Sequence, residues 1–450
     1  MASISYMKKE KESHVIVVGG GVAGLLAALW VQACGHKVTL IERAKACGGL
    51  LRSVRNEHGY TFDCGTHIPS LTGHPVVDEL MFGSGSDVDW INLPTLKKGN
   101  YFAGVLNSSS QFIDITKISK NDYLEVLSEL INSLTTDHEA VNLSDALALN
   151  FGNTLTKKIF TPLLKKIYRH HSFEELDANA HRFLAYARII VGSAEVSREL
   201  KKSPVYDAKF AFHEASDHKS ASIHRYPKKN GTGAWVDVLV KQFVEKGGAL
   251  LTDTEISSVV PNTGTLGLSN GNTLYFQHLI WTGPLGLLAK YLFSEVKVTR
   301  PDFVPTRLYH LTLSAKPLCD AYYVYINDPD AKSFRVTLYS NITGEDDDFR
   351  VTVETVAYDD TVDAQLILQE LIQAKLFKEG STLTSYSSEY LPNGFPAMTT
   401  KIQLENKGLR DQVAKFSNIS IGGRGASESF FMNDVLNAIA KDLEGKFGLP

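Results

Sequence analysis

The sequence predicts an α/β fold in which a domain built on βαβ units is interleaved with a second domain of antiparallel sheet plus helices. Three observations lead to this prediction. A strand, a glycine-rich turn, a helix and a second strand succeed one another over residues 14–43. Period-two alternation dominates residues 307–358, which is typical of antiparallel strands. A chain of 450 residues, 43% of them hydrophobic, also exceeds what one core usually holds, so two domains are expected.

The first glycines of the chain are spaced for phosphate binding. Gly19, Gly21 and Gly24 stand in the G-x-G-x-x-G order directly after the apolar run 15–18. In such a turn the first glycine permits the bend, the second lets the backbone approach a pyrophosphate, and the third lets the helix pack on the strand. The helix expected over 22–33 would direct its free N–H groups and its positive dipole end at the phosphates.

Glu42 ends the second expected strand, residues 37–41, about 20 residues beyond the glycines. A carboxylate in this place accepts hydrogen bonds from an adenosine ribose and disfavours a ribose with a 2′-phosphate. The unit is therefore a Rossmann-like fold for FAD or NAD.

Residues 48–67 decide between these two cofactors. Gly48-Gly49 and Arg52 precede the segment 59–67, which ends in Asp63-Cys64-Gly65-Thr66-His67. This resembles the second glycine loop and the hydrophobic-Asp-x-Gly segment of the flavin amine oxidase superfamily, which includes protoporphyrinogen oxidase, carotenoid desaturases and UDP-galactopyranose mutase. In that superfamily the loop carries the pyrophosphate and extends toward the flavin. The resemblance implies FAD, with Arg52 as a cation for phosphate.

Composition excludes several classes of protein. The formal net charge is −4, so a nucleic-acid-binding surface is not indicated. The four cysteines lack metal-site spacing and His170-His171 is typical of a polar helix end, so no metal is expected. No apolar run reaches membrane-spanning length and the first residues lack an apolar signal core. We expect a cytoplasmic monomer or homodimer whose partner is a small-molecule substrate.

Between the first unit and the predicted sheet, the pattern favours helices. Residues 69–109 are rich in Gly, Ser, Asp and Pro and are expected to form an irregular connection. Helices are expected over 123–134, 144–152 with Ser144 as the cap, 154–168 and 173–190. Residues 197–222 are charged and aperiodic, which indicates a surface excursion. The block resembles the helical insertion of the superfamily.

The pattern then returns to the nucleotide-binding domain. A helix over 235–246 and a strand over 250–260 resemble the superfamily's second crossover, which would place the backbone near Ile256 against the adenine. The strand that ends at Thr282-Gly283-Pro284 resembles its strand-Thr-x-Pro signature.

The end of the chain resembles the terminal motif of the same superfamily. Residues 418–425 would form a strand and a Gly-Arg turn, with a helix over 430–443 whose N-terminus faces the flavin. A helix dipole there would stabilise negative charge on a reduced flavin.

Strands are expected over 308–313, 321–326, 334–340 and 349–356, and a helix over 362–377. We therefore expect an FAD-binding domain of the glutathione-reductase or amine-oxidase type, made of residues 13–109, 223–300 and 390–450. Residues 110–222 and 301–389 would form the substrate domain.

FAD is expected to be non-covalent, because no cysteine lies beyond Cys319 to attach it. The motifs and the resemblance place the following residues at the cofactor: Gly19, Gly21, Val22, Ala23, Gly24, Glu42, Arg43, Gly48, Gly49, Leu50, Leu51, Arg52, Gly65, Thr66, His67, Ile256, Thr282, Gly283, Pro284, Gly423, Arg424, Asn433, Asp434 and Val435.

Three functions stay open at this point. The first is an FAD-dependent oxidoreductase that takes a hydride from a C–N or C–C centre, although residues 307–313 lack the lysine typical of amine oxidases. The second is a mutase of the UDP-galactopyranose mutase type, acting on a nucleotide sugar, and the third is a flavin-binding scaffold without turnover. His67 is the first candidate for proton transfer beside the flavin, with Tyr309 and His310 as alternatives.

Overall fold

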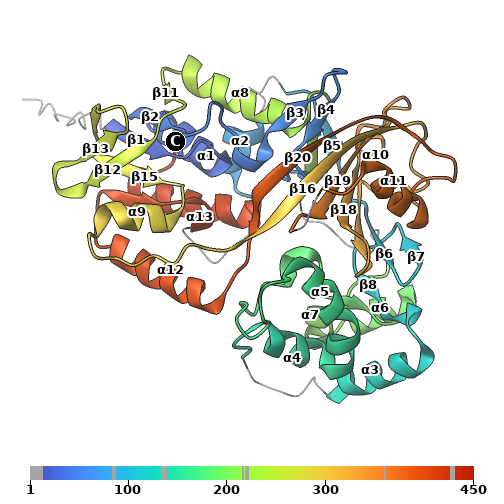
Figure 1. Ribbon diagram of the computed structural model, residues 1–450. Coiled ribbons are helices and arrows are strands. Elements are labelled where there is room, and N and C mark those ends of the chain that lie inside the picture. The colour runs from blue at the N-terminus through green and yellow to red at the C-terminus, as the bar shows by residue number, and fades with distance from the viewer. Residues whose placement is uncertain are drawn as a thin grey trace, which may run out of the picture.

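The computed structural model describes residues 14–83, 88–132, 139–214, 217, 222–358, 361–425 and 431–450. It contains a nucleotide-binding unit built on a parallel sheet, a larger sheet beside it, and a helical unit at the far end of the larger sheet (Figure 1). The chain passes between these parts several times, so each is assembled from segments distant in sequence.

The nucleotide-binding unit is built on five parallel strands. They are β1 (His14–Val18), β2 (Lys37–Ile41), β11 (Ala249–Leu251), β15 (His278–Trp281) and β21 (Ile419–Ile421). Their spatial order is β11-β2-β1-β15-β21, which is the doubly wound order with its switch point between β1 and β15. Val18 pairs in register with both Ile41 and Trp281, so these strands end level and the residues after them emerge on one edge.

Alternate side chains of this sheet pack into two apolar layers. Val17 and its neighbours contact α1 (Val22–Ala33), α2 (Pro75–Phe82), α8 (Gly231–Glu245) and α13 (Met432–Phe447). Ile16 and Trp281 face the other layer, which consists of α9 (Leu285–Leu292), α12 (Thr400–Val413) and the antiparallel strands β12 (Ile256–Val260), β13 (Thr265–Leu268) and β14 (Thr273–Tyr275). The sheet is therefore buried on both faces, as its continuous apolar strands require.

The larger sheet has seven strands in the order β20-β16-β19-β18-β17-β6-β7. They are β20 (Leu383–Pro396), β16 (Phe303–Leu313), β19 (Arg350–Val356), β18 (Ser333–Leu338), β17 (Tyr323–Asn327), β6 (Lys98–Phe102) and β7 (Val105–Asn107). All neighbours are antiparallel except β17 and β6. The four strands expected over 308–356 are confirmed as β16 to β19.

The two faces of the larger sheet differ in polarity. Val336, Val353 and Leu311 share an apolar core with α11 (Ala364–Gln373), the helix expected over 362–377. The intervening residues, among them Arg335, Thr337, Thr352 and Glu354, occupy the opposite face. Two-residue alternation therefore leaves a polar face, which lies toward the nucleotide-binding unit.

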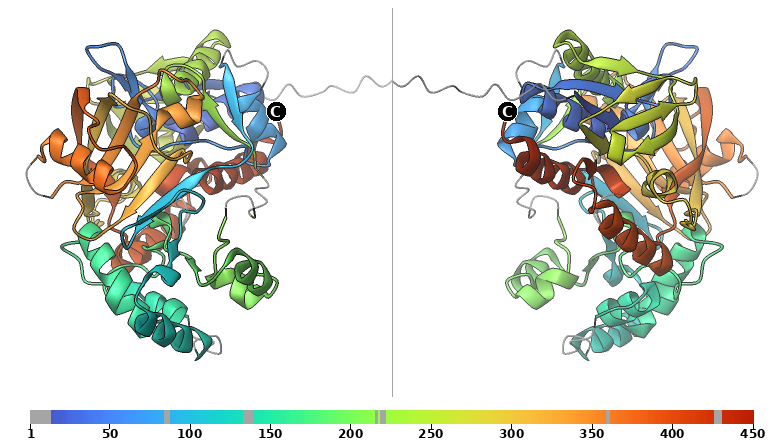
Figure 2. Two further views of the ribbon diagram at one scale, coloured as in Figure 1. Left: turned by 90° about the vertical axis from the view of Figure 1, so that its right-hand side faces the viewer. Right: turned by 90° about the vertical axis from the view of Figure 1, so that its left-hand side faces the viewer.

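The helical unit contains α3 (Lys120–Asn132), α4 (Leu143–Leu155), a π-helical turn over Thr156–Phe160, α5 (Thr161–Ile167), α6 (Ala194–Leu200) and α7 (Pro204–Lys209) (Figure 1). Its teal and light-green helices lie at the lower end of the molecule in both views of Figure 2. Asn142, and not Ser144, caps α4, because its side chain accepts from the Asp145 amide. The predicted helix over 173–190 is wrong, since only a 3-10 turn (Arg182–Leu184) and β9 (Ile189–Ile190) form there.

Segments expected to be irregular also contain regular structure. Residues 69–109 include α2, β5 (Trp90–Leu93), β6 and β7, and β5 pairs with β10 (His224–Pro227). Pairing with β17 places β6 and β7 in the larger sheet, whereas the sequence assigns their segment to the nucleotide-binding domain. The strand expected over 250–260 is two strands, β11 and β12, in different sheets.

Three short strand pairings and one short helix complete the connections. They are β3 (Ser53–Arg55) with β4 (Thr61–Asp63), β8 (Ile113–Asp114) with β9, the pair of β5 and β10, and α10 (Tyr339–Thr343). The helix expected over 430–443 begins at Met432, and Phe430 lies outside the described residues.

Candidate cofactor and substrate site

The three glycines of the first turn have the separate roles that their spacing predicts. Gly19 has a φ of +104°, and a Cβ on Gly24 would lie 1.8 Å from the Gly19 carbonyl oxygen. By contrast, a Cβ on Gly21 would meet nothing within 4 Å. Gly24 is therefore needed for packing of α1, while the Gly21 backbone faces open space at the helix N-terminus where an anion is favoured.

Glu42 lies at the end of β2 and faces the same turn. Its Oε2 accepts from the Gly20 amide at 2.6 Å, and its Oε1 accepts from the Ala44 amide at 2.7 Å. These two bonds hold the carboxylate at the carboxyl edge of the sheet. A carboxylate retains further lone pairs when each oxygen accepts one bond, so Glu42 can still accept from a hydroxyl.

A cavity of about 460 Å³ opens at the carboxyl ends of the parallel strands, and we call it the central cavity. It is lined by Gly19, Gly21, Val22, Ala23, Glu42, Gly48, Gly49, Leu50, Leu51, His67, Thr282, Gly283, Pro284, Gly423, Arg424, Met432 and Val435. All of these except Met432 are predicted at the cofactor by the sequence. The cavity lies at the switch point, where doubly wound sheets bind their ligands.

Two further cavities adjoin the central one. The outer cavity, about 310 Å³, shares Gly19, Glu42, Gly283 and Pro284 with it and is also lined by Val18, Ile41, Arg43, Thr254, Glu255, Ile256, Trp281, Leu287 and Tyr291. The sheet cavity, about 340 Å³, shares Leu51, His67 and Met432 with it and is also lined by Thr66, Ile68, Pro69, Ser70, Leu96, Tyr323, Arg335, Phe431 and Asn433. The shared lining residues place the three cavities in a row from β12 to the larger sheet, and we call this row the trough.

The second glycine loop supports the floor of this trough. The Gly48 amide donates to the Gly20 carbonyl at 2.8 Å, so the two glycine turns are tied together. Arg52, however, does not line the trough. Its guanidinium forms an ion pair with Glu389 of β20, which opposes the predicted contact with phosphate.

The residues that follow β15 and the first turn of α13 close the central cavity. The Thr282 hydroxyl lies 2.9 Å from the Val18 carbonyl and 3.1 Å from the Gly19 carbonyl, to which it donates, and it fixes the strand ends. The first turn of α13 contributes Met432 and Val435 to the wall. A helix N-terminus directed at the cavity favours negative charge there.

Four of the residues predicted at the cofactor line none of the three cavities. They are Gly24, Arg52, Gly65 and Asp434. A Cβ on Gly65 would lie 3.1 Å from Glu354, so this glycine permits the contact between the His67 loop and the larger sheet. Asp434 lies in the first turn of α13, where an acidic residue stabilises the helix.

Asp63 anchors the strand that leads to His67. Its carboxylate is fully buried and accepts from the Tyr226 hydroxyl at 2.6 Å, from Ser53 Oγ at 2.7 Å and from the Thr232 amide at 2.8 Å. Satisfied buried carboxylates rigidify their surroundings. Asp63 therefore fixes β4, and with it the start of the loop 64–67.

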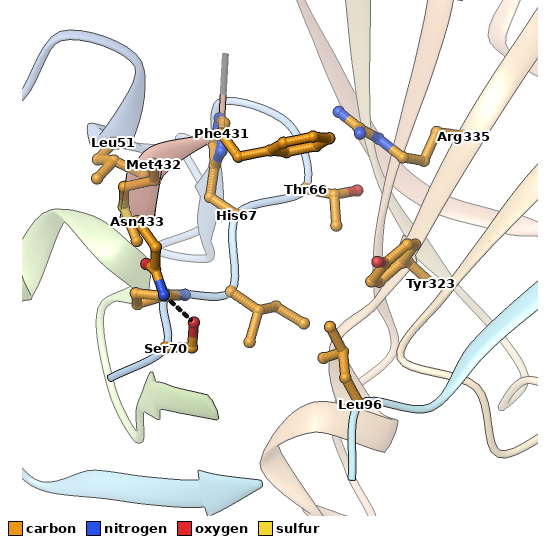
Figure 3. A pocket seen from close by; sticks show the side chains of 12 residues that line it. Leu51, Thr66, His67, Ser70, Leu96, Tyr323, Arg335, Phe431, Met432 and Asn433 are labelled. Atoms are coloured by element: carbon orange, nitrogen blue, oxygen red, sulfur yellow. Dashed lines mark hydrogen bonds between the residues drawn. The ribbon is translucent and has the colours of Figure 1, made fainter. Parts of the chain in front are cut away.

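His67 lies where the central and sheet cavities meet (Figure 3). Burial and the nearby charge of Arg335 lower the pKa of His67 to about 4, although Glu354 and a hydrogen bond to the Cys64 carbonyl act in the other direction. The imidazole is therefore uncharged at neutral pH. Because one ring nitrogen donates to the backbone, the other presents a lone pair.

An ion pair on the polar face of the larger sheet was missed by sequence reasoning. Arg335 Nε lies 2.6 Å from Glu354 Oε1, and Nη2 lies 2.7 Å from Oε2. Glu354 also accepts from the amide and the hydroxyl of Thr66, each at 3.0 Å. The two-residue alternation of the sequence could have placed Arg335 and Glu354 on the same face of the sheet. Their contact, however, depends on β18 and β19 being neighbours, which the sequence does not show.

The alternative candidates Tyr309 and His310 lie outside the trough. Tyr309 is on the face covered by α11, where its hydroxyl donates to the Val362 carbonyl at 2.6 Å. His310 is on the polar face but is buried against Phe62, with Nδ1 3.1 Å from Thr352 Oγ1. Tyr309 and His310 lie on β16, which is two strands away from β18, the strand that carries Arg335. Their side chains are therefore too far along the sheet to line the cavity.

No helix among the described residues is long and apolar enough to cross a membrane. The described residues also contain no group of three or more His, Cys, Asp or Glu side chains arranged to hold a metal ion.

Comparison with known proteins agrees with this architecture. Residues 17–81 match the NAD(P)-binding Rossmann-like domain family. The chain is 25% identical over 283 residues to 4,4'-diapolycopene oxygenase from Methylomonas sp, which covers 60% of this chain and 55% of that protein. It is 32% identical over 102 residues to L-amino-acid oxidase from Vipera ammodytes ammodytes, covering 20% of this chain and 21% of the oxidase. The matched segments thus span about half or less of these relatives.

Solved structures share the fold over nearly the whole chain. Reduced UDP-galactopyranose mutase matches with a TM-score of 0.70 and 18% identity, covering 92% of this chain and 89% of the mutase. A protein assigned as protoporphyrinogen oxidase from Exiguobacterium sp. 255-15 matches with a TM-score of 0.66 and 15% identity, covering 97% and 98%. These matches confirm the predicted fold class, in which a Rossmann-like domain is part of the fold shared with UDP-galactopyranose mutase, and they agree with the expected resemblance to the amine-oxidase-like flavoenzymes.

Proposed function

We propose that this chain is an oxidoreductase that holds FAD non-covalently and takes a hydride from a C–N or C–C centre of a small organic substrate. The observation that carries the proposal is the row of three adjoining cavities, with Glu42 shared by the outer and central cavities and His67 shared by the central and sheet cavities. We also propose that the protein is located in the cytoplasm and that it is a monomer or a homodimer.

The residues that line the trough change along its length, and their order matches the order of adenine, ribose, pyrophosphate and flavin in FAD. The outer cavity is lined by Ile256, Trp281, Leu287 and other apolar residues beside the charged Arg43 and Glu255, and we assign the adenine to it. Glu42 suits the ribose, and the open space at Gly21 suits a pyrophosphate at the N-terminus of α1. The flavin would then lie against the first turn of α13, beside His67.

The cysteines support non-covalent binding. All four are free. Burial raises the pKa of Cys47 to about 11, and burial with the charge of Glu389 raises that of Cys64 to about 12. Both therefore remain thiols at neutral pH, and a thiol is a poor nucleophile for attachment to a ring.

FAD, when bound, would supply the hydride acceptor, and the protein would handle the proton that leaves with the hydride. The uncharged His67 ring can accept that proton or a hydrogen bond from the substrate. Glu354 holds Thr66 and so fixes the loop that carries His67. The sheet cavity also offers an apolar or aromatic surface to the substrate at Leu96, Tyr323 and Phe431, beside the polar side chains of Ser70 and Asn433.

A mutase of the UDP-galactopyranose mutase type is the second candidate, favoured by the TM-score of 0.70. A nucleotide sugar carries a diphosphate, which calls for more than one free cation in the sheet cavity. Among the described residues that line it, Arg335 is the single arginine, and Glu354 already binds it with two hydrogen bonds. The oxidoreductase is therefore the better supported proposal.

Cofactor release and anaerobic reduction test the proposal. The purified protein should be yellow and should release about one FAD on acid precipitation. Anaerobic photoreduction and a subsequent metabolite screen separate the candidates, because an oxidoreductase substrate bleaches the oxidised flavin whereas a mutase acts only after reduction. A colourless protein that saturating FAD neither colours nor stabilises would contradict the proposal, and stable binding without any reduction would leave a flavin-binding scaffold.

A further inference from the structure

The hydroxyl of Tyr323 is a hydrogen-bonding group of the sheet cavity that the protein itself does not pair. Two other buried tyrosines show the usual arrangement: the Tyr226 hydroxyl donates to Asp63 at 2.6 Å, and that of Tyr186 donates to Asn327 at 2.6 Å. Tyr323 is only 8% exposed, yet among the described residues no atom forms a hydrogen bond with its hydroxyl. Buried polar groups are normally satisfied, so this hydroxyl is a candidate for binding a ligand.

This hydroxyl faces the space in which a substrate would lie. Tyr323 lines the sheet cavity, and Figure 3 shows its oxygen on the side of the ring that faces the cavity. Burial raises the pKa of Tyr323, although the nearby charge of Arg335 acts in the other direction. The hydroxyl therefore keeps its proton at neutral pH, and the cavity contains a neutral hydrogen-bond donor.

Strand pairing places this donor close to the loop that carries His67. Tyr323 pairs in register with Thr337 of the antiparallel neighbour β18, so the two side chains are neighbours on one face of the sheet. The Thr337 hydroxyl lies 2.6 Å from the hydroxyl of Thr66, the residue before His67. Tyr323 and His67 thus flank this contact and line the same cavity, on opposite sides of it in Figure 3.

A neutral donor and an uncharged imidazole across one cavity suit a substrate with a carbonyl group. A carbonyl oxygen that accepts a hydrogen bond can hold the negative charge that builds up as the adjacent carbon loses a proton. We propose that Tyr323 binds the carbonyl oxygen of the substrate and that His67 takes a proton from the carbon next to that carbonyl. This rests on the proposed function, and it narrows the C–N or C–C centre to a C–C bond beside the carbonyl of an uncharged, mainly apolar ketone.

The reaction balances with the hydride acceptor that we already propose. The carbon next to the carbonyl gives its proton to the ring nitrogen of His67 that presents a lone pair. The following carbon loses a hydrogen with both bonding electrons to the oxidised flavin, and a double bond forms between the two carbons. The substrate loses two electrons and the flavin gains them. The charges of Arg335 and Arg424, which both act on His67 against the opposing charge of Glu354, favour negative charge on the substrate oxygen.

A neutral oxygen fits this site better than a carboxylate. Arg335 directs its Nε and Nη2 to Glu354 at 2.6 and 2.7 Å, and its side chain also forms a hydrogen bond with Tyr325. Glu354 lies 3.0 Å from the amide of Thr66, a residue of the cavity wall, so its negative charge opposes a second carboxylate there. A ketone requires only one neutral donor, which Tyr323 supplies.

Binding of two isosteric ligands to the FAD-loaded protein tests the carbonyl site. Acetophenone carries a ketone, and α-methylstyrene has the same shape with a methylene group in place of the oxygen. We expect Tyr323→Phe to weaken acetophenone binding about 5-fold, the size of one neutral hydrogen bond, and to leave α-methylstyrene binding within about 2-fold. Isothermal calorimetry measures both. Tyr309→Phe, which removes a buried hydroxyl from the other face of the same sheet, is the matched control and should change neither affinity.

Proton exchange tests His67 without any oxidation. Acetophenone has no carbon beyond its methyl group from which a hydride could leave, so its methyl protons exchange with D2O only through loss of a proton beside the carbonyl. Proton NMR follows this exchange, and we expect the wild-type protein to accelerate it over the rate in buffer. His67→Ala and Tyr323→Phe should each slow it by about 100-fold or to the buffer rate. His67→Ala should keep the wild-type affinity for acetophenone, which separates proton transfer from binding.

Each result supports or overturns one part of the proposal. Equal acetophenone affinity in the wild type and Tyr323→Phe would overturn the carbonyl site, and a wild-type exchange rate no higher than that of buffer would overturn the proton transfer. Benzoate that binds more tightly than acetophenone, and loses this advantage in Tyr323→Phe, would show an anion site instead. The FAD content of the same samples reports on the proposed function, because a protein without FAD that still exchanges the methyl protons would contradict the oxidoreductase and leave the carbonyl site standing.

Discussion

The two walls of the trough are built in different ways. On the side of the nucleotide-binding unit the wall is mostly backbone, made of glycine turns, strand ends and the first turn of α13. On the side of the larger sheet it is made of side chains, Tyr323 and Arg335, held in place by Glu354 on a third strand. The first wall therefore depends on chain conformation, and the second depends on pairings between residues far apart in the sequence.

This difference determines which substitutions disrupt each wall. A backbone wall is sensitive to an added Cβ or a lost strand-end contact. A side-chain wall is sensitive to the loss of one partner, because the remaining charge stays buried without compensation. Single substitutions on each wall test this contrast, and the largest effect is expected on the side-chain wall.

Glu354→Met should have the largest effect on stability. The Glu354 side chain is 6% exposed and that of Arg335 21%, so the substitution leaves an arginine enclosed without its partner. We expect a loss of about 3–5 kcal/mol in the free energy of unfolding, measured by urea denaturation. The double variant Arg335→Met and Glu354→Met should recover most of this loss. If the single variant is as stable as the wild type, the side-chain wall does not depend on this ion pair.

Gly24→Ala tests the backbone wall, again through the free energy of unfolding measured by urea denaturation. The new Cβ would lie 1.8 Å from a backbone oxygen that cannot move away without opening the turn. We expect a loss of about 3 kcal/mol of stability, together with weaker FAD binding. Gly445→Ala is the matched control, because a Cβ at this position of α13 meets nothing within 4 Å and should stabilise the protein by about 0.5–1 kcal/mol. Equal effects of the two substitutions would contradict the steric role of Gly24.

His67→Ala tests the point where the two walls meet. The variant should retain FAD, while reduction of the flavin by the substrate slows by about 100-fold or more, the size expected for a positioned base. Tyr309→Phe, on the far face of the sheet, should leave the rate unchanged. Stopped-flow reduction measures both variants, and a wild-type rate in His67→Ala would make this histidine structural.

The pH dependence adds an independent readout for His67. Because its pKa is lowered to about 4, the uncharged form persists above that value and is lost as pH falls through it. The acid limb of kcat/KM should therefore lie near pH 4 and should be absent in His67→Ala. An acid limb near the ordinary histidine value of about 6.5 would mean that His67 is not the titrating group.

Glu42→Ala should have the smallest effect on the fold and a local effect on the cofactor. FAD binding should weaken by about 1.5–3 kcal/mol, the cost of losing a charge-assisted bond to a ribose hydroxyl. In the wild-type protein Glu42 accepts hydrogen bonds from the Gly20 and Ala44 amides, and the variant leaves both amides without this acceptor. Part of the loss in affinity comes from these two lost bonds. Titration of the apoprotein with FAD measures it, and an unchanged affinity would place the adenosine elsewhere.

The same contrast explains where the structure differs from what the sequence led us to expect. Arg52 is expected at a phosphate, but Glu389, more than 300 positions away, binds it instead. Residues 98–107 have the composition of a loop, yet β17 supplies the pairing that makes them strands. Composition and short-range spacing do not contain these partners.

By itself, the sequence determined the nucleotide-binding turn, the acidic end of β2, the alternation of the larger sheet and the residues of the central cavity. These features arise from local conformation, because a glycine spacing or a two-residue period acts within a few residues of the chain. Only the tertiary structure decided which strands became neighbours. That order gives Arg335 its partner Glu354, since a charge buried between distant segments is neutralised only by what those segments bring beside it.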